Sequence, residues 1–194
     1  VNHGMSYQSV GDLYLEFPGH ENYTDFYRDL DISDATASVR YTVDGVVYER
    51  EVISSFADDV VAVRLTASQK GMLNFNASIA SPHKKQQIAV EDGDIVLRGT
   101  TGDQEGLEGK VEFTTRTRVI SNGGTVSETG SGLEVIGADE AVVLISTGTN
   151  FTDYRTLSAD ADKEALDILN AASSKAYKTM KKAHVAFYKE YFDR

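Results

Sequence analysis

The chain contains no cysteine, which excludes disulfides, thiolate metal sites and thiol nucleophiles. It also contains no tryptophan, so that only tyrosine and phenylalanine could offer a platform on which a sugar ring stacks. Histidine is scarce, and no two histidines are four residues apart as in a helical zinc site. The histidines are His3, His20, His83 and His184. We therefore expect no metal and no cofactor, and we interpret His184 as a packed residue on a helix.

Basic residues are also few, with 19 Lys and Arg against 30 Asp and Glu and a formal net charge of -11. Nucleic-acid binding requires clustered cations that displace counterions from phosphates, so a nucleic-acid partner is not expected. No apolar run approaches the ~20 residues that a membrane-spanning helix needs, and no membrane contact is expected. The hydrophobic fraction of 41% is high enough for a folded core.

What the sequence does contain, up to about Thr147, is alternation of apolar and polar residues, which predicts β-strands. In residues 35–43 the odd positions are apolar, the pattern of a strand with one buried face. Asp44-Gly45 then signals a hairpin, and residues 46–56 form the expected returning strand. Residues 142–145 are wholly apolar, so both faces of this strand should be covered, one of them by helices. Further strands are expected around residues 13–17, 61–67, 73–79, 95–99 and 111–119, which together favour a sandwich or barrel.

Beyond about Asp160 the pattern changes to that of amphipathic helices. Asp160, Asp162 and Glu164 alternate like part of a calcium loop, but no glycine follows to make its sharp turn. We interpret them as acids at a helix N-terminus, where Ser158 can also cap. This first helix is expected to end near Asn170.

A second helix is expected to start at a cap made by Ser173 or Ser174, with apolar residues every three or four positions. It continues to the final Arg194 without a C-cap glycine. The chain also opens without a methionine. We therefore expect this sequence to be a piece of a longer protein.

The residues supply no complete catalytic set. The string Gly130-Ser131-Gly132 lacks the spacing of a nucleophile elbow, and no phosphate-binding loop occurs. Paired carboxylates serve glycoside cleavage, and Asp12 with Glu16 could approach each other, as could Asp29 with Asp31. With so many acidic residues, we interpret these pairs as ordinary surface charge. No catalytic residue is predicted.

An aromatic group at Tyr23, Phe26 and Tyr27 could stack on a sugar, although core or rim packing is the simpler interpretation. A stand-alone carbohydrate-binding module therefore remains an alternative, as does a purely structural sandwich.

Several segments resemble glycoside hydrolase family 95. The run YQSVGDLYLEF at residues 7–17 is similar to that family's YQPLGDL segment, and YRDLD at residues 27–31 is similar to its YRRELDL strand. Residues 37–51 and 61–67 resemble the strands that follow. At the other end, residues 184–194 resemble the helix that links the family's sandwich to its barrel. The likeness is vague between residues 84 and 137.

This resemblance implies a mainly β fold, an antiparallel β-sandwich of the galactose-mutarotase-like super-sandwich type with a C-terminal α-helical extension. Residues 1–150 would form the sandwich, with its N-terminal strands missing, and residues 151–194 a helical linker toward an absent α/α barrel. The family's catalytic residues lie in that barrel, and none maps to this chain.

The function implied is that of a non-catalytic N-terminal domain of an α-L-fucosidase, which supports the barrel in hydrolysing fucosylated glycans. The expected partner is therefore a catalytic barrel of the same protein, with glycan contact possible in principle. The missing strands and the exposed helix predict self-association of the isolated chain. The family's polysaccharide-degrading role implies a periplasmic or extracellular location in a bacterium.

Overall fold

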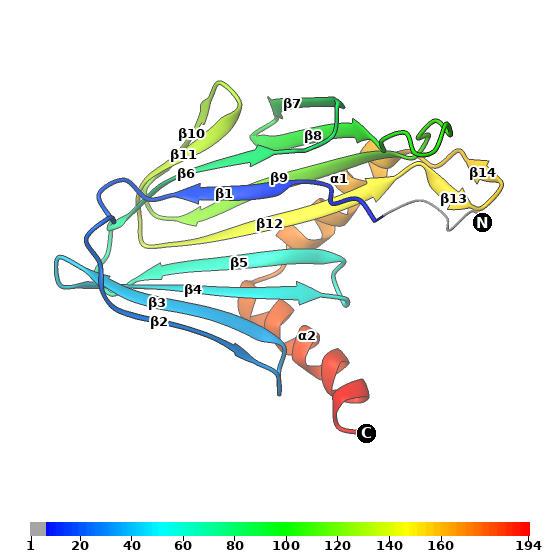
Figure 1. The fold of residues 1–194 in the computed structure, drawn as a ribbon. Helices are drawn as coiled ribbons and strands as arrows, with labels where there is room; N and C mark the ends of the chain where they lie inside the picture. Colours follow the sequence, from blue (N-terminus) through cyan, green and yellow to red (C-terminus); the bar gives the residue numbers. More distant parts are fainter. Residues whose placement is uncertain (1–6) are drawn as a thin grey trace.

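The structure is a computed structural model that describes residues 7–194 and consists of two antiparallel sheets followed by two helices (Figure 1). The helices are α1 (Ala161–Ser173) and α2 (Tyr177–Phe192). The strands are β1 (Asp12–Glu16), β2 (Thr24–Asp31), β3 (Thr36–Val43), β4 (Val46–Ser55), β5 (Val60–Ala67), β6 (Leu73–Ala80), β7 (Lys85–Glu91), β8 (Asp94–Thr100), β9 (Glu112–Asn122), β10 (Thr125–Thr129), β11 (Gly132–Ala138), β12 (Glu140–Thr149), β13 (Phe151–Asp153) and β14 (Thr156–Leu157).

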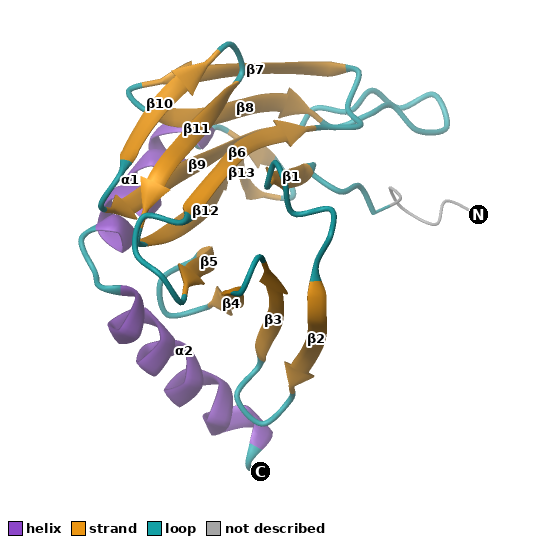
Figure 2. Cartoon of the chain, turned by 90° about the vertical axis from the view of Figure 1, so that its left-hand side faces the viewer, coloured by secondary structure: helices purple, strands orange, loops and turns teal. Residues whose placement is uncertain are grey.

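The large sheet has eight strands in the order β2-β3-β4-β5-β12-β9-β8-β7, and the small sheet has four in the order β1-β6-β11-β10. Strands β13 and β14 form a separate hairpin. The small sheet packs on one face of the large sheet, while α1 and α2 lie against the other, outer face (Figure 2). The expected mainly β sandwich with a C-terminal helical part is therefore confirmed. The division into residues 1–150 and 151–194 stays a prediction.

The β3–β4 hairpin has the register that the sequence predicts. Tyr41 and Val43 on β3, with Val46 and Tyr48 on β4, are buried in the core between the sheets. The turn residues Asp44 and Gly45 both have positive φ, 50° and 77°. Alternating burial and turn chemistry thus agree in fixing this hairpin.

Strand β12 contributes to two separate cores, as its apolar run predicts. Val143 packs between the two sheets, whereas the neighbouring Leu144 points to the outer face and packs under the helices. The outer core also contains Ile53 of β4, Leu169 of α1 and Met180 of α2. The helices therefore complete the fold, because they cover an apolar face of the large sheet.

The expected helix boundaries were correct at the first cap and wrong at the second. The Asp160 carboxylate accepts hydrogen bonds from the first turn of α1, as predicted. Helix α1 continues to Ser173 rather than ending near Asn170, because the Ser173 and Ser174 hydroxyls bond to carbonyls three residues earlier within the helix. The N-cap of α2 is Ala176, which makes no side-chain cap bond. Both serines therefore belong to the end of α1 and not to the start of α2.

Candidate functional site

The carboxylate pairs singled out in the sequence do not form a common site. Asp12 and Glu16 lie exposed at opposite ends of β1. Asp31 accepts hydrogen bonds from the backbone and hydroxyl of Ser33 in the following turn, while Asp29 lines a groove that is described below. Within residues 7–194, no group of three or more His, Asp or Glu side chains is placed to hold a metal ion. His3 lies outside the described residues.

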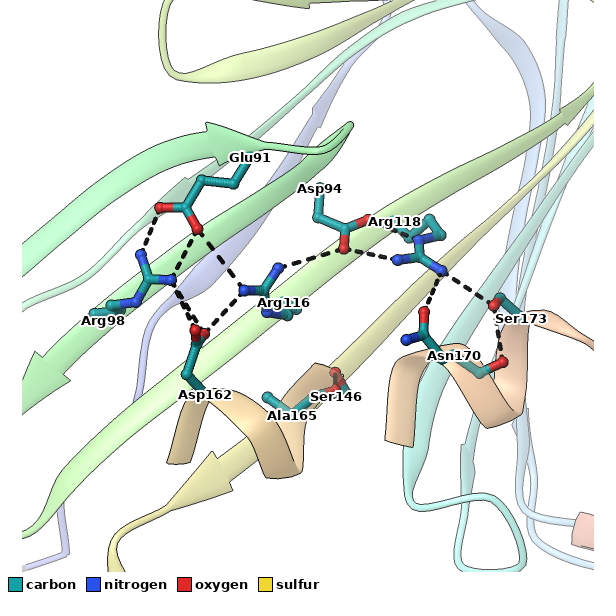
Figure 3. A network of polar contacts seen from close by, with 10 residues as sticks. All are labelled: Glu91, Asp94, Arg98, Arg116, Arg118, Ser146, Asp162, Ala165, Asn170 and Ser173. Carbon is teal, nitrogen blue, oxygen red and sulfur yellow. Dashed lines mark hydrogen bonds and ion pairs between the residues drawn. The ribbon is translucent and has the colours of Figure 1, made fainter. Parts of the chain in front are cut away.

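The most extensive polar arrangement joins α1 to the outer face of the large sheet (Figure 3). We call it the arginine network, and it consists of Glu91, Asp94, Arg98, Arg116, Arg118 and Asp162. Arg98 on β8 donates to both oxygens of Glu91 at 2.6 and 2.8 Å, and to Asp162 of α1 at 3.1 Å. Asp162 therefore anchors α1 to the large sheet.

The centre of the network is almost completely buried. The Asp94 side chain is 1% exposed and the Arg116 side chain 6%, with 3.7 Å between their closest charged atoms. Arg118 donates to both oxygens of Asp94 at 2.7 and 2.9 Å, and reaches Asn170 and Ser173 of α1 at 3.0 and 3.1 Å. Charged groups so far from water are stable only when each has its partner. The arrangement is structural, with charges of opposite sign neutralising one another.

The network shifts the pKa of both acids at its edge. The hydrogen bonds from Arg98 are the main reason why the pKa of Glu91 lies below its ordinary value. Partial burial raises the pKa of Asp162, but the hydrogen bonds from Arg98 and Arg116 together outweigh this effect and the pKa is lowered.

Stability is therefore expected to fall in acid. A carboxyl with a lowered pKa in the folded state stabilises the protein above its ordinary pKa, and this contribution disappears as the pH falls through the lowered value. The loss should begin near pH 4.5, the ordinary value for Glu91, and continue below 3.8, that for Asp162. The free energy of unfolding in urea, followed by circular dichroism at stepwise lower pH, measures this loss of stability. The variant Arg98→Gln should show a shallower pH dependence over this range, and an unchanged slope would contradict the assignment.

Helix α2 is held at two places along its length. Near its start, Lys181 binds Glu51 of β4. Further along, the buried His184 contacts the carbonyl oxygens of Asp34 and Ala35 at 3.0 and 3.2 Å through Nε2. The expected packing role of His184 is thus correct, and its partner is the turn between β2 and β3.

Aromatic side chains of α2 meet an exposed ring from the turn between β4 and β5. The Phe187 ring stacks on the Phe56 ring with their centroids 5.6 Å apart. The centroid of the Tyr191 ring lies 5.4 Å from that of Phe187. Phe56 is 73% exposed and Tyr191 57%. A concavity of about 520 Å³ adjoins Phe56 and reaches Ile168 of α1. We call Phe56, Phe187 and Tyr191 the aromatic ridge; a group of partly exposed aromatic rings is typical of a contact with more protein.

The aromatic residues predicted as a sugar platform are divided between two places. The rings of Tyr23 and Phe26 lie 5.5 Å apart, and Tyr23 reaches toward Tyr41 at 6.1 Å. Tyr27 instead lines the same groove as Asp29.

The arginine network was not predicted from the sequence. The signal that could have indicated it is that Arg116 and Arg118, two residues apart on one strand, occupy the same face.

Comparison with known proteins agrees with this architecture. Residues 1–154 match the family described as glycosyl hydrolase family 65, N-terminal domain. A curated relative, alpha-L-fucosidase 2 of Arabidopsis thaliana, is 30% identical over 217 residues, which cover 97% of this chain and 25% of that protein. The chain thus spans about a quarter of the length of the relative that it matches.

A solved structure with the same fold is described as a kojibiose phosphorylase from the human microbiome. It matches with a TM-score of 0.64 at 9% identity, over 96% of this chain and 28% of that one. The relative carries the activity name that the sequence motifs implied, and the matched family description is that of a glycosyl hydrolase N-terminal domain. This chain belongs to the glycosyl hydrolase family 65 N-terminal domain family.

Proposed function

We propose that this chain is the non-catalytic N-terminal part of a fucose-releasing glycoside hydrolase, and that it supports a catalytic α/α barrel of the same protein. The observation that carries the proposal is the aromatic ridge, which lies beside the last helix of an otherwise well-packed domain. The name and length of the Arabidopsis relative support it. A polysaccharide-degrading role would place the protein in the periplasm or outside the cell, and we propose this location as well.

The arginine network and the anchors of α2 suit such a supporting role. They fix both helices on the large sheet at charged or hydrogen-bonded contacts, in addition to the apolar core beneath them. A rigid helix pair can hold the aromatic ridge at a constant position for the barrel.

An activity measurement tests this proposal directly. The whole protein encoded by the gene should hydrolyse 4-nitrophenyl α-L-fucoside, and the 194-residue chain alone should not. Hydrolysis by the isolated chain would overturn the proposal. In the whole protein, Phe56→Asp should lower the free energy of unfolding, because a charge would then face an apolar contact.

The aromatic ridge also predicts the behaviour of the isolated chain. Without a covering domain, the ridge should drive association, so that the molar mass measured by light scattering rises with protein concentration. Phe56→Asp should reduce this rise, whereas Phe151→Asp, in the β13–β14 hairpin, should leave it unchanged. If both variants behave like the unmodified chain, the ridge is not the contact.

A further inference from the structure

A second concavity lies on the outer face of the large sheet, across strands β2 to β5. We call it the β2–β5 groove; its volume is about 370 Å³, at the small end of the ~300–1,000 Å³ range of ligand sites. Apart from Tyr27 and Val39, the residues that line it are polar or charged. The side chains that matter here are Tyr27, Asp29, Arg40, Glu49, Glu51 and Arg64.

The charged walls of the groove are set by strand register. Arg40 lies directly opposite Glu49 on the neighbouring strand, and Glu51 lies directly opposite Arg64. Side chains opposite each other on adjacent strands share one face of the sheet. Guanidinium and carboxylate groups therefore alternate across the groove.

One wall is held in place by contacts outside the groove. Arg64 donates to both carboxylate oxygens of Glu140, each at 2.8 Å, and Glu51 is bound by Lys181 of α2. These contacts fix the positions of Arg64 and Glu51 before any ligand arrives. Because these side chains are already fixed, binding a ligand would cost less conformational entropy at this wall.

The other end of the groove has unused binding capacity. Among the described residues, the carboxylate of the half-buried Asp29 has no hydrogen-bond or ion-pair partner. Tyr27 is 61% exposed, and it lies opposite Arg40, whose contact with Glu49 is a long 3.8 Å. A carboxylate acceptor, a guanidinium donor and an aromatic face are thus together and accessible.

We propose that the β2–β5 groove is a binding site for a neutral saccharide. Each sugar hydroxyl both donates and accepts hydrogen bonds, so it can use Asp29 and Arg40 together, while the carbon face of the ring packs on Tyr27. An anion fits less well, because the chain as a whole carries a charge of -11. An apolar ligand would leave these polar groups unpaired.

The proposal does not depend on the supporting role of the domain. The groove shares no residue with the aromatic ridge. A saccharide could therefore bind here whether or not a barrel covers the ridge.

The test is an NMR titration of the 194-residue chain with methyl α-L-fucoside, methyl β-D-galactoside and methyl α-D-glucoside. With at least one of these sugars, saturable changes in backbone amide shifts should cluster in the four strands that form the groove. Tyr27→Ala and Asp29→Asn should each weaken binding by about tenfold. Tyr14→Ala removes an exposed tyrosine from β1, outside the groove, and should bind like the unmodified chain.

Unchanged circular dichroism spectra would establish that the variants are folded. Three results would each overturn the proposal: no saturable shifts with any of the three sugars, shifts that cluster elsewhere, or affinity unaffected by both groove variants. Inorganic phosphate serves as an anionic probe, and equal shifts at the same amides with phosphate would contradict a site for neutral ligands.

Discussion

Replacing Asp94 by asparagine is expected to destabilise the chain by about 3–5 kcal/mol, the usual cost of breaking a buried ion pair. Its carboxylate, 1% exposed, accepts two hydrogen bonds from Arg118 and lies near the buried Arg116. The amide of asparagine has nearly the same shape but no charge. Two guanidinium groups would then remain beside each other without the anion that they share.

The free energy of unfolding in urea, followed by circular dichroism, measures this loss. Glu108→Gln provides a matched control, because it makes the same chemical change in an ion pair with Lys85 whose side chains are 58% and 64% exposed. An exposed pair contributes only ~0–1 kcal/mol. Equal effects of the two substitutions would show that the arginine network does not contribute to stability as argued.

Leu169→Ala is expected to destabilise the chain by about 2–5 kcal/mol, the range for large-to-small changes in a core. Leu169 is fully buried in the outer core, between α1 and the large sheet. The substitution removes apolar contact and leaves a cavity at the place where α1 covers Leu144 and Ala62. The same urea experiment measures the effect.

Leu30→Ala is a suitable control for this second substitution. Leu30 lies on the edge strand β2 and is 63% exposed, so its truncation should change stability by less than ~0.5 kcal/mol. If Leu169→Ala were as mild as this control, α1 would be an appendage rather than part of the cooperative fold.

Much of the fold could be predicted where burial follows a simple period. The β3–β4 hairpin alternates cleanly and has a turn signal, and β12 is apolar at every position that both cores require. Strand β10 has no such signal, because all five of its residues are exposed and only Val126 is strongly apolar. Its pairing with β11 comes from the turn and the sheet edge rather than from an apolar face.

The arginine network could not be predicted for a different reason. Arg116 occupies a position on β9 that faces outward, and a charged residue there is normally taken for a solvent-exposed one. It is buried because α1, which begins some forty residues later in the chain, lies over that face. Burial by an element distant in the sequence cannot be inferred from the alternation of apolar and polar residues within one strand. The β2–β5 groove likewise depends on four strands whose register the sequence specifies only in part.

The contact of His184 with the carbonyls of Asp34 and Ala35 has a consequence for the direction of α2. A second bond, from the Tyr188 hydroxyl to the carbonyl of Ile32 at 2.7 Å, reaches the same short turn. The turn between β2 and β3 thereby helps to determine the direction of α2 relative to the large sheet. Lengthening it by one or two residues would therefore change the angle at which α2 crosses the large sheet, and with it the packing of Met180 in the outer core.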